Sequence, residues 1–70
     1  MTQLDKDILV SFAKNGMVKA RVAQQLFMHY NTVEYHLQKI KTETGLDPKN
    51  LFQLAELLGV KIDVTQKDGG

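Results

Sequence analysis

The chain has 70 residues, 43% hydrophobic and 24% charged, which suits one globular domain and leaves no room for a second core. It contains no cysteine, which excludes disulfides and thiolate metal sites. No apolar run approaches the ~20 residues that span a bilayer, and the first residues lack the pattern of a secretory signal. We therefore expect a soluble, cytoplasmic protein.

The net charge of +1 hides an uneven distribution. Between residues 14 and 41 there are five basic side chains and one acid, a net charge of +4, whereas the rest of the chain has a net charge of −3. A local positive field suits a polyanionic partner, although a solvated charged surface has the same composition.

Two helices are predicted in the first 27 residues. The first covers about residues 5–15, and its apolar side chains recur at helical spacing: Leu4, Ile8, Leu9 and Phe12. Asn15-Gly16 ends it, and a shorter helix follows over about residues 18–27. The second helix is expected to bury Val22, Ala23 and Leu26. The larger apolar side chains predicted to lie in the core are Phe12, Phe27 and Met28.

Two more helices are predicted in the second half. One covers about residues 30–44, with Val33, Leu37 and Ile40 on its apolar stripe and Gly45 after its last turn. Asp47-Pro48 opens another, from about residue 48 or 49 to Leu58. Its expected buried stripe is Leu51, Leu54, Ala55 and Leu58. Phe52 and Leu57 widen this apolar surface, which fits either packing against the first helix or a homodimer seam.

These elements predict an all-α fold, a small helical bundle of about four helices over residues 1–59, and a flexible C-terminal tail over residues 60–70. Residues 60–64 alternate apolar and polar side chains, as a short strand does, but have no visible partner strand. Residues 65–70 are predicted to be disordered.

The segment from Lys19 to Gln38 has the order of a helix-turn-helix: a short helix, a turn and a longer helix. This geometry needs a small residue where the two helices cross, and Ala23 supplies it. It also needs apolar side chains that lock the pair together, here Val22, Leu26, Met28, Val33 and Leu37. The longer helix is then free to enter a major groove about 12 Å wide.

The face of this helix opposite the apolar stripe is polar. Asn and Gln side chains bind adenine in a bidentate manner, and Thr donates to phosphate or touches a thymine methyl. The predicted base-reading residues are Tyr30, Asn31, Thr32, Glu34, Tyr35 and Gln38. The predicted phosphate-contacting residues are Lys19, Arg21, Lys39 and Thr42.

The same segment contains an alanine, a leucine and an aromatic, then His-x-Asn-Thr at residues 29–32, Tyr-x-Leu at 35–37, a Lys-Ile pair at 39–40 and Thr-Gly-Leu at 44–46. This pattern resembles the C-terminal helix-turn-helix domain of the PucR/CdaR family of transcription regulators, over about residues 4–58. The resemblance implies that the helix after His29 reads DNA and that His29 caps it.

The chain departs from the family at three positions. The family commonly has arginine where this chain has Tyr30, Glu34 and His36, and arginine is the usual guanine reader and phosphate clamp. Lower affinity or a target with less guanine is therefore expected. Glu34 would repel the DNA backbone unless it accepts from a cytosine amine or pairs with Lys41 or Arg21.

Family members usually carry this domain behind a large ligand-sensing region. The present chain begins with Met and an acidic helix start, so a stand-alone regulator from a phage or mobile element and an excised domain are both compatible with it. One small domain contacts few base pairs, so a homodimer through the fourth helix is also expected, with Phe52 and Leu57 at the seam.

No catalytic set can be assembled, and neither an enzyme, a cofactor, a small-molecule ligand nor a metal site is expected. Protonation of His29 or His36 would add positive charge, so binding to DNA is expected to strengthen at mildly acidic pH.

Two alternatives remain open at this stage. The first is a protein–protein interaction module that uses the fourth helix and the exposed face of the third. The second is a helix-turn-helix of the response-regulator type, which shares part of the motif and dimerises through its last helix.

Overall fold

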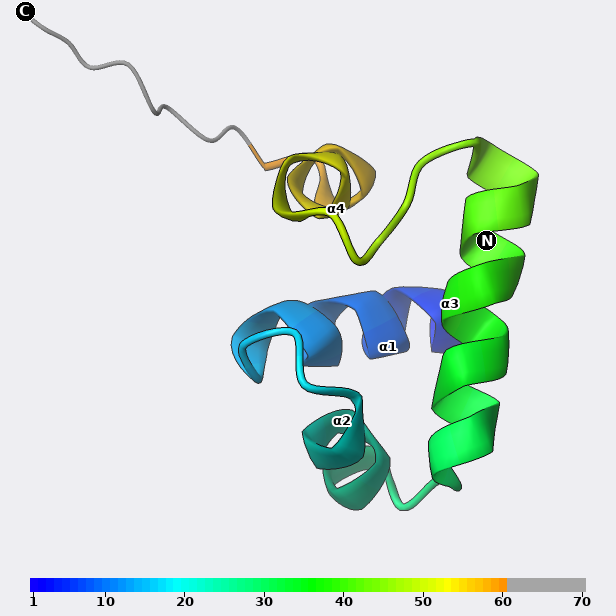
Figure 1. Cartoon of the computed structure of the whole chain (residues 1–70), viewed down its shortest axis with the longest axis vertical. Coiled ribbons are helices and arrows are strands. Elements are labelled where there is room, and N and C mark those ends of the chain that lie inside the picture. The colour runs from blue at the N-terminus through cyan, green and yellow to red at the C-terminus, as the bar shows by residue number, and fades with distance from the viewer. Residues whose placement is uncertain (61–70) are drawn as a thin grey trace, which may run out of the picture.

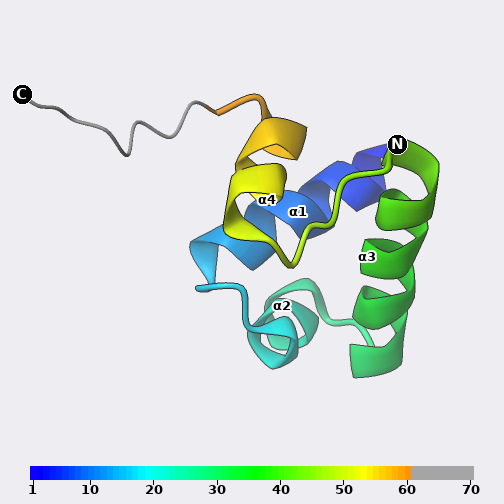
Figure 2. The ribbon, with the colours of Figure 1, turned by 45° about the horizontal axis from the view of Figure 1, so that its top comes forward.

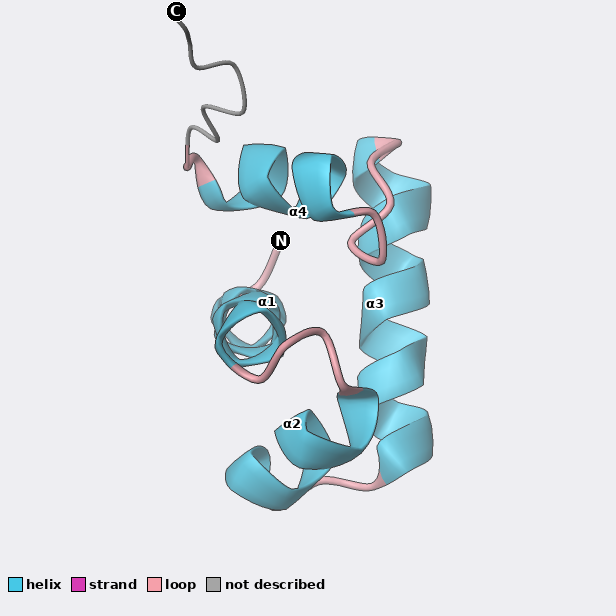
Figure 3. Ribbon diagram, turned by 60° about the vertical axis from the view of Figure 1, so that its left-hand side comes forward, coloured by secondary structure: helices cyan, strands magenta, loops and turns pink. Residues whose placement is uncertain are grey.

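The computed structural model describes residues 1–60, which form four α-helices: α1 (Gln3–Lys14), α2 (Lys19–Leu26), α3 (Tyr30–Thr44) and α4 (Leu51–Leu58). In Figure 1, α3 stands upright beside the other three helices, and Figure 3 shows α1 end-on between α4 and α2. The predicted all-helical fold is confirmed for these residues. From residue 61 onward, the expected strand and tail lie outside the described residues.

The first helix begins earlier than its apolar periodicity predicts, because a capping box starts it. The Thr2 hydroxyl accepts from the amide of Asp5 (3.1 Å), and the Asp5 carboxylate accepts from the amide of Thr2 (3.0 Å). Leu4, which shares the helical spacing of the apolar side chains, is 43% exposed, because Asp5 takes the inward position of this first turn. The stripe that α1 buries therefore begins with a carboxylate and continues through Ile8, Leu9 and Phe12.

The core surrounds α1, which packs against all three other helices, as Figure 2 also shows for α4. The predicted locking residues of the helix-turn-helix all belong to this core or pack against it, and Ala23 is buried as expected. Within residues 1–60, α4 packs against α1 alone. The fully or nearly buried apolar side chains are Ile8, Leu9, Phe12, Val22, Ala23, Val33, Leu37, Ile40, Leu54 and Ala55.

The turn between α2 and α3 contradicts one prediction. Phe27 was expected in the core, but its side chain is 96% exposed. The reason is its backbone: Phe27 ends α2 in the left-handed region (φ 55°, ψ 48°), and the amide of the next residue, Met28, donates back to the carbonyl of Ala23 (2.9 Å). Met28, which was also predicted to lie in the core, is partly buried and packs against it.

The fourth helix begins at Leu51, later than the predicted residue 48 or 49. The side chain of Asn50 accepts from the amides of Phe52 (3.0 Å) and Gln53 (3.2 Å), which makes it the N-cap. The predicted buried stripe is only partly correct, because Leu51 is 54% exposed and Leu58 is half-buried. Since α4 has one helix to pack against, it buries a narrower face than its sequence offers.

Replacing Phe27 with glycine is expected to stabilise the fold. Glycine adopts the left-handed conformation without the steric penalty that Phe27 bears, and little packing is lost with so exposed a ring. The greater freedom of glycine in the unfolded chain offsets part of this gain, so we expect about 0.5–1 kcal/mol more unfolding free energy, measured by urea denaturation.

The matched comparison is Met17→Gly. Met17 is also left-handed (φ 64°) but packs against the core, so its replacement should gain less or lose stability. A Phe27→Gly protein less stable than the original would contradict the assignment of strain to this turn.

Candidate nucleic-acid interface

One face of α3 is uncovered. Asn31, Tyr35, Gln38 and Thr42 are all exposed, on the side opposite the buried Val33, Leu37 and Ile40. We call these four exposed residues the outer row. They span 11 residue steps of the helix, about 17 Å at 1.5 Å per residue. The outer row is thus a line of hydrogen-bonding side chains on a rigid helix, long enough to follow several base pairs.

Beside the outer row, the first turn of α3 contacts α2. Tyr30 is 46% exposed, and the Lys19 ammonium lies 5.3 Å from the centre of its ring, as in a cation–π contact. Thr32 is half-buried. Tyr30 and Thr32 therefore lie at the edge of the outer row rather than on it.

Glu34 is held by two lysines from other elements. Its Oε1 accepts from Lys19 (2.5 Å), and its Oε2 accepts from Lys49 (2.9 Å) in the loop between α3 and α4. Hydrogen bonds from Lys19 and then Lys49 hold the pKa of Glu34 below its usual value, and the Glu34 contact raises the pKa of Lys19. Of the two ways predicted for Glu34 to compensate its charge, the internal ion pair is present, but with Lys19 and Lys49 in place of Lys41 or Arg21.

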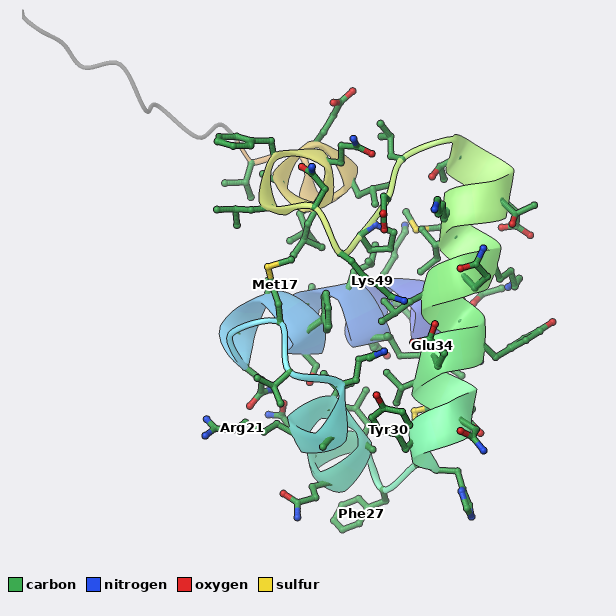
Figure 4. The ribbon with its side chains drawn as sticks, in the orientation of Figure 1. Met17, Arg21, Phe27, Tyr30, Glu34 and Lys49 are labelled. Atoms are coloured by element: carbon green, nitrogen blue, oxygen red, sulfur yellow. The ribbon has the colours of Figure 1, made fainter. Side chains whose placement is uncertain are left out.

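The residues expected to pair with Glu34 lie elsewhere. Lys41 approaches Asp47 at 3.8 Å, and Arg21 is exposed on the side of α2 that faces away from α3 (Figure 4).

A second charged cluster attaches α3 to the start of α1. The side chain of Asp5 is fully buried; its Oδ1 lies 2.7 Å from Nδ1 of His36, and its Oδ2 accepts from Lys39 (3.0 Å). Burial alone would raise the pKa of Asp5, but hydrogen bonds from Thr2, His36 and Lys39 outweigh burial and hold that pKa well below its usual range. His36 and Lys39 therefore point towards α1, and not outward with the outer row.

His29 occupies the N-cap position of α3 but does not cap it with its side chain. Its imidazole is exposed and makes no capping hydrogen bond, whereas its backbone carbonyl accepts from the amides of Thr32 (3.0 Å) and Val33 (3.2 Å). The capping role implied by the family resemblance is thus limited to the backbone.

Sequence reasoning missed two residues that shape this surface, Asp5 and Lys49. The spacing of Thr2 and Asp5 matches a capping box, and this local signal was available. Lys49 carries no local signal, because its partner Glu34 lies fifteen residues away on another element.

Comparison with known proteins assigns the family. The family model of the PucR C-terminal helix-turn-helix domain matches residues 6–59. The chain belongs to this family. The matched range includes α2, the turn and the whole of α3, and it confirms the resemblance inferred from the motif over the response-regulator alternative. No curated protein and no solved structure matches the chain.

Among residues 1–60, no helix has the length and apolar character that crossing a membrane requires. In the same part of the chain, no group of three or more His, Cys, Asp or Glu side chains is placed to hold a metal ion.

Replacing Asp5 with asparagine is expected to lower the free energy of unfolding by about 2–3 kcal/mol near neutral pH, because a buried carboxylate that holds the Lys39 ammonium and the His36 ring is lost. Since the folded pKa of Asp5 lies below its ordinary value of 3.8, the carboxylate stabilises the fold above that pH, and this contribution is lost as the pH falls. The difference between the two proteins should therefore shrink below about pH 4.

The measurement is chemical denaturation over a series of pH values. Asp7→Asn is the matched control, because Asp7 is exposed on the same helix and its one side-chain hydrogen bond within residues 1–60 is with Gln3. If the free energy of unfolding of Asp5→Asn stays below that of the original protein by a constant amount down to about pH 2, the charge of Asp5 does not stabilise the fold.

Proposed function

We propose that this chain is a transcription regulator that binds double-stranded DNA by inserting the outer row of α3 into the major groove. The observation that carries the proposal is the exposure of Asn31, Tyr35, Gln38 and Thr42 on a helix whose opposite face is fully buried. The family, a helix-turn-helix domain of regulators, supports the same function. The proposal is of a binding protein and not of an enzyme.

The outer row offers the groups that base edges need. In this proposal Asn31 and Gln38 make bidentate hydrogen bonds to adenine, and Tyr35, 63% exposed, contacts bases between them. Tyr30 and Thr32 contact bases from the edge of the outer row. Thr42, at the far end, contacts phosphate. Without arginine in the outer row, bidentate reading of guanine is absent, so adenine-containing steps are favoured.

In this proposal, fewer phosphate contacts are expected than the excess of basic side chains between residues 14 and 41 suggests. Lys19, Lys39 and Lys41 are each within 4 Å of a carboxylate of the same chain. Arg21 forms no ion pair within residues 1–60, but it extends from the side of α2 that faces away from α3, so we assign the main phosphate contact to Lys19, which starts α2 beside Tyr30, and a weaker one to Arg21. Lys39 must leave the buried Asp5 to contact phosphate and is assigned the weakest.

Alanine at Asn31 or Gln38 is expected to relax base preference, at about 1–3 kcal/mol for each lost bidentate contact. Alanine at Lys19 should instead weaken binding on all duplexes and reduce the slope of log affinity against log salt by about one. Sequencing of duplexes bound from a random pool measures the first effect, and salt titration by fluorescence anisotropy measures the second.

Lys6→Ala is the matched control for charge, because Lys6 is exposed on α1, outside the proposed interface. Unchanged base preference in Asn31→Ala would show that the outer row is not the reading surface. Affinity for a partner that barely changes with salt would favour the protein-interaction module, to which the exposed Tyr35 and Phe27 also lend support.

We also propose that two copies bind DNA together through α4. Leu51 and Phe52 are 54% and 57% exposed, and beside them an apolar hollow is lined by Ala13, Leu51, Leu54, Ala55, Leu58 and Val60. Leu57, the other expected seam residue, packs against the core of its own chain. A seam on α4 leaves the outer row of α3 uncovered, so two copies can address two half-sites.

Phe52→Asp is expected to abolish self-association without unfolding the protein, because the Phe52 ring is already largely in solvent. Sedimentation equilibrium at increasing protein concentration measures this self-association. Gln24→Asp, an exposed change of the same charge on α2, is the control. If the original chain remains monomeric both alone and on a two-site duplex, the seam does not exist.

A further inference from the structure

Three charged side chains from separate parts of the chain meet beside the outer row. Lys19 is the first residue of α2, Glu34 lies in the second turn of α3, and Lys49 lies in the loop before α4. Figure 4 shows Lys49 reaching down from its loop towards Glu34, between α2 and α4. Each carboxylate oxygen accepts from one ammonium, at 2.5 Å for Lys19 and 2.9 Å for Lys49. We call these three residues the Glu34 clamp.

The chemistry of the Glu34 clamp is that of an anion site with its anion already in place. A carboxylate that receives two ammonium groups presents the same charge and hydrogen-bond acceptors as two oxygens of a backbone phosphate. The side chains are accessible, at 25% exposed for Lys19, 35% for Glu34 and 41% for Lys49. Exposed ion pairs of this kind are individually weak, so an incoming polyanion is able to compete with Glu34 for both lysines.

The Glu34 clamp also lies where a polyanion such as the DNA backbone would meet it. Glu34 follows Tyr30 by one helical turn and precedes Gln38 by one turn, so it borders the surface that would enter the groove. Lys19 starts α2, the helix that crosses the DNA backbone in helix-turn-helix complexes. Lys49 approaches Glu34 from the opposite direction along α3, which places a second cation further along the same border.

We propose that the Glu34 clamp is a phosphate site for DNA that is occupied in the free protein by its own carboxylate. On binding, backbone phosphates displace Glu34, and Lys49 joins Lys19 as a contact to the sugar–phosphate backbone. The inference rests on the proposed DNA-binding function, and it adds Lys49 to the interface and gives Glu34 a role in selecting the sequence.

The preference for particular DNA sequences follows from the position of the displaced Glu34 carboxylate. Glu34 without its lysines stands close to phosphates, where only a hydrogen-bond donor compensates its charge. Among the base edges of the major groove, the amino group of cytosine is the partner that carboxylates use in recognition. Sequences with cytosine at this position satisfy Glu34, and sequences without it leave an unpaired anion in the interface. The clamp therefore lowers non-specific affinity more than specific affinity.

The decisive variant is Glu34→Gln, which keeps the shape of the side chain and removes its charge. Its affinity for a random-sequence duplex, measured by fluorescence anisotropy at about 0.1 M salt, should exceed that of the original chain roughly three- to tenfold, the range expected for two weak ion pairs. Glu43→Gln is the matched control: it lies on the same helix, is exposed, forms no ion pair within residues 1–60 and changes the net charge equally. It should change the affinity less than about twofold.

Lys49 is tested in the Glu34→Gln background, where no carboxylate complicates its role. Adding Lys49→Ala should reverse the gain in affinity and lower the salt slope by about one, whereas adding Lys6→Ala should leave the slope unchanged. Thermal denaturation followed by circular dichroism establishes that each variant is folded at the temperature of the binding assay. In bound pools, the original chain should enrich cytosine at one position, and Glu34→Gln should lose that enrichment.

The outcomes separate this inference from the function on which it rests. Steep salt-dependent binding by the original chain, together with equal affinities for Glu34→Gln and Glu43→Gln, overturns the phosphate site and leaves DNA binding intact. An unchanged slope on adding Lys49→Ala overturns it as well. If none of the proteins binds duplex in a salt-dependent manner, the proposed function fails and the inference with it.

Discussion

The arrangement of the molecule depends on one helix, α1, that must contact all the others. In a domain of this size, a single helix with Ile8, Leu9 and Phe12 along its inner side provides much of the buried apolar surface. Packing of aliphatic side chains alone permits a helix to rotate somewhat about its axis, because such contacts are not directional. The buried carboxylate of Asp5 supplies the missing direction.

Asp5 fixes α3 through His36 and Lys39, which are three residues apart and therefore neighbours on one flank of that helix. With this flank held against the start of α1 and the stripe of Val33, Leu37 and Ile40 buried, the orientation of the outer row is determined. The exposure of Asn31 and Gln38 is thus a consequence of contacts made on the other sides of the helix. A buried ion cluster contributes specificity of arrangement here, whatever its net contribution to stability.

The sequence predicted α3 at its observed bounds, because a strong apolar stripe and a left-handed Gly45 mark it. It failed at Phe27, since local pattern does not show that an aromatic residue ends α2 with a left-handed backbone and turns its ring outward. The sequence placed the start of α4 too early. Asp47-Pro48 suggested a helix start there, but Asn50 is the residue that caps α4. The outer row was predictable, since exposure on a helix follows from periodicity.

The ion pairs were not predictable in the same way, because they join residues far apart in sequence. Thirty-one residues separate Asp5 from His36, and fifteen separate Glu34 from each of its lysines. Their effect on binding differs from that of free surface charge. A lysine that leaves a carboxylate for a phosphate releases the cations condensed on DNA but leaves an anion that attracts cations in turn, so fewer ions are released overall. Under the proposed function, the salt dependence of binding would be shallower than the number of lysines implies, and discrimination between sequences would rest more on hydrogen bonds from the outer row. Glu34 and His36 hold the helices of this chain together, and in the proposed complex DNA would have to displace the contacts of Glu34.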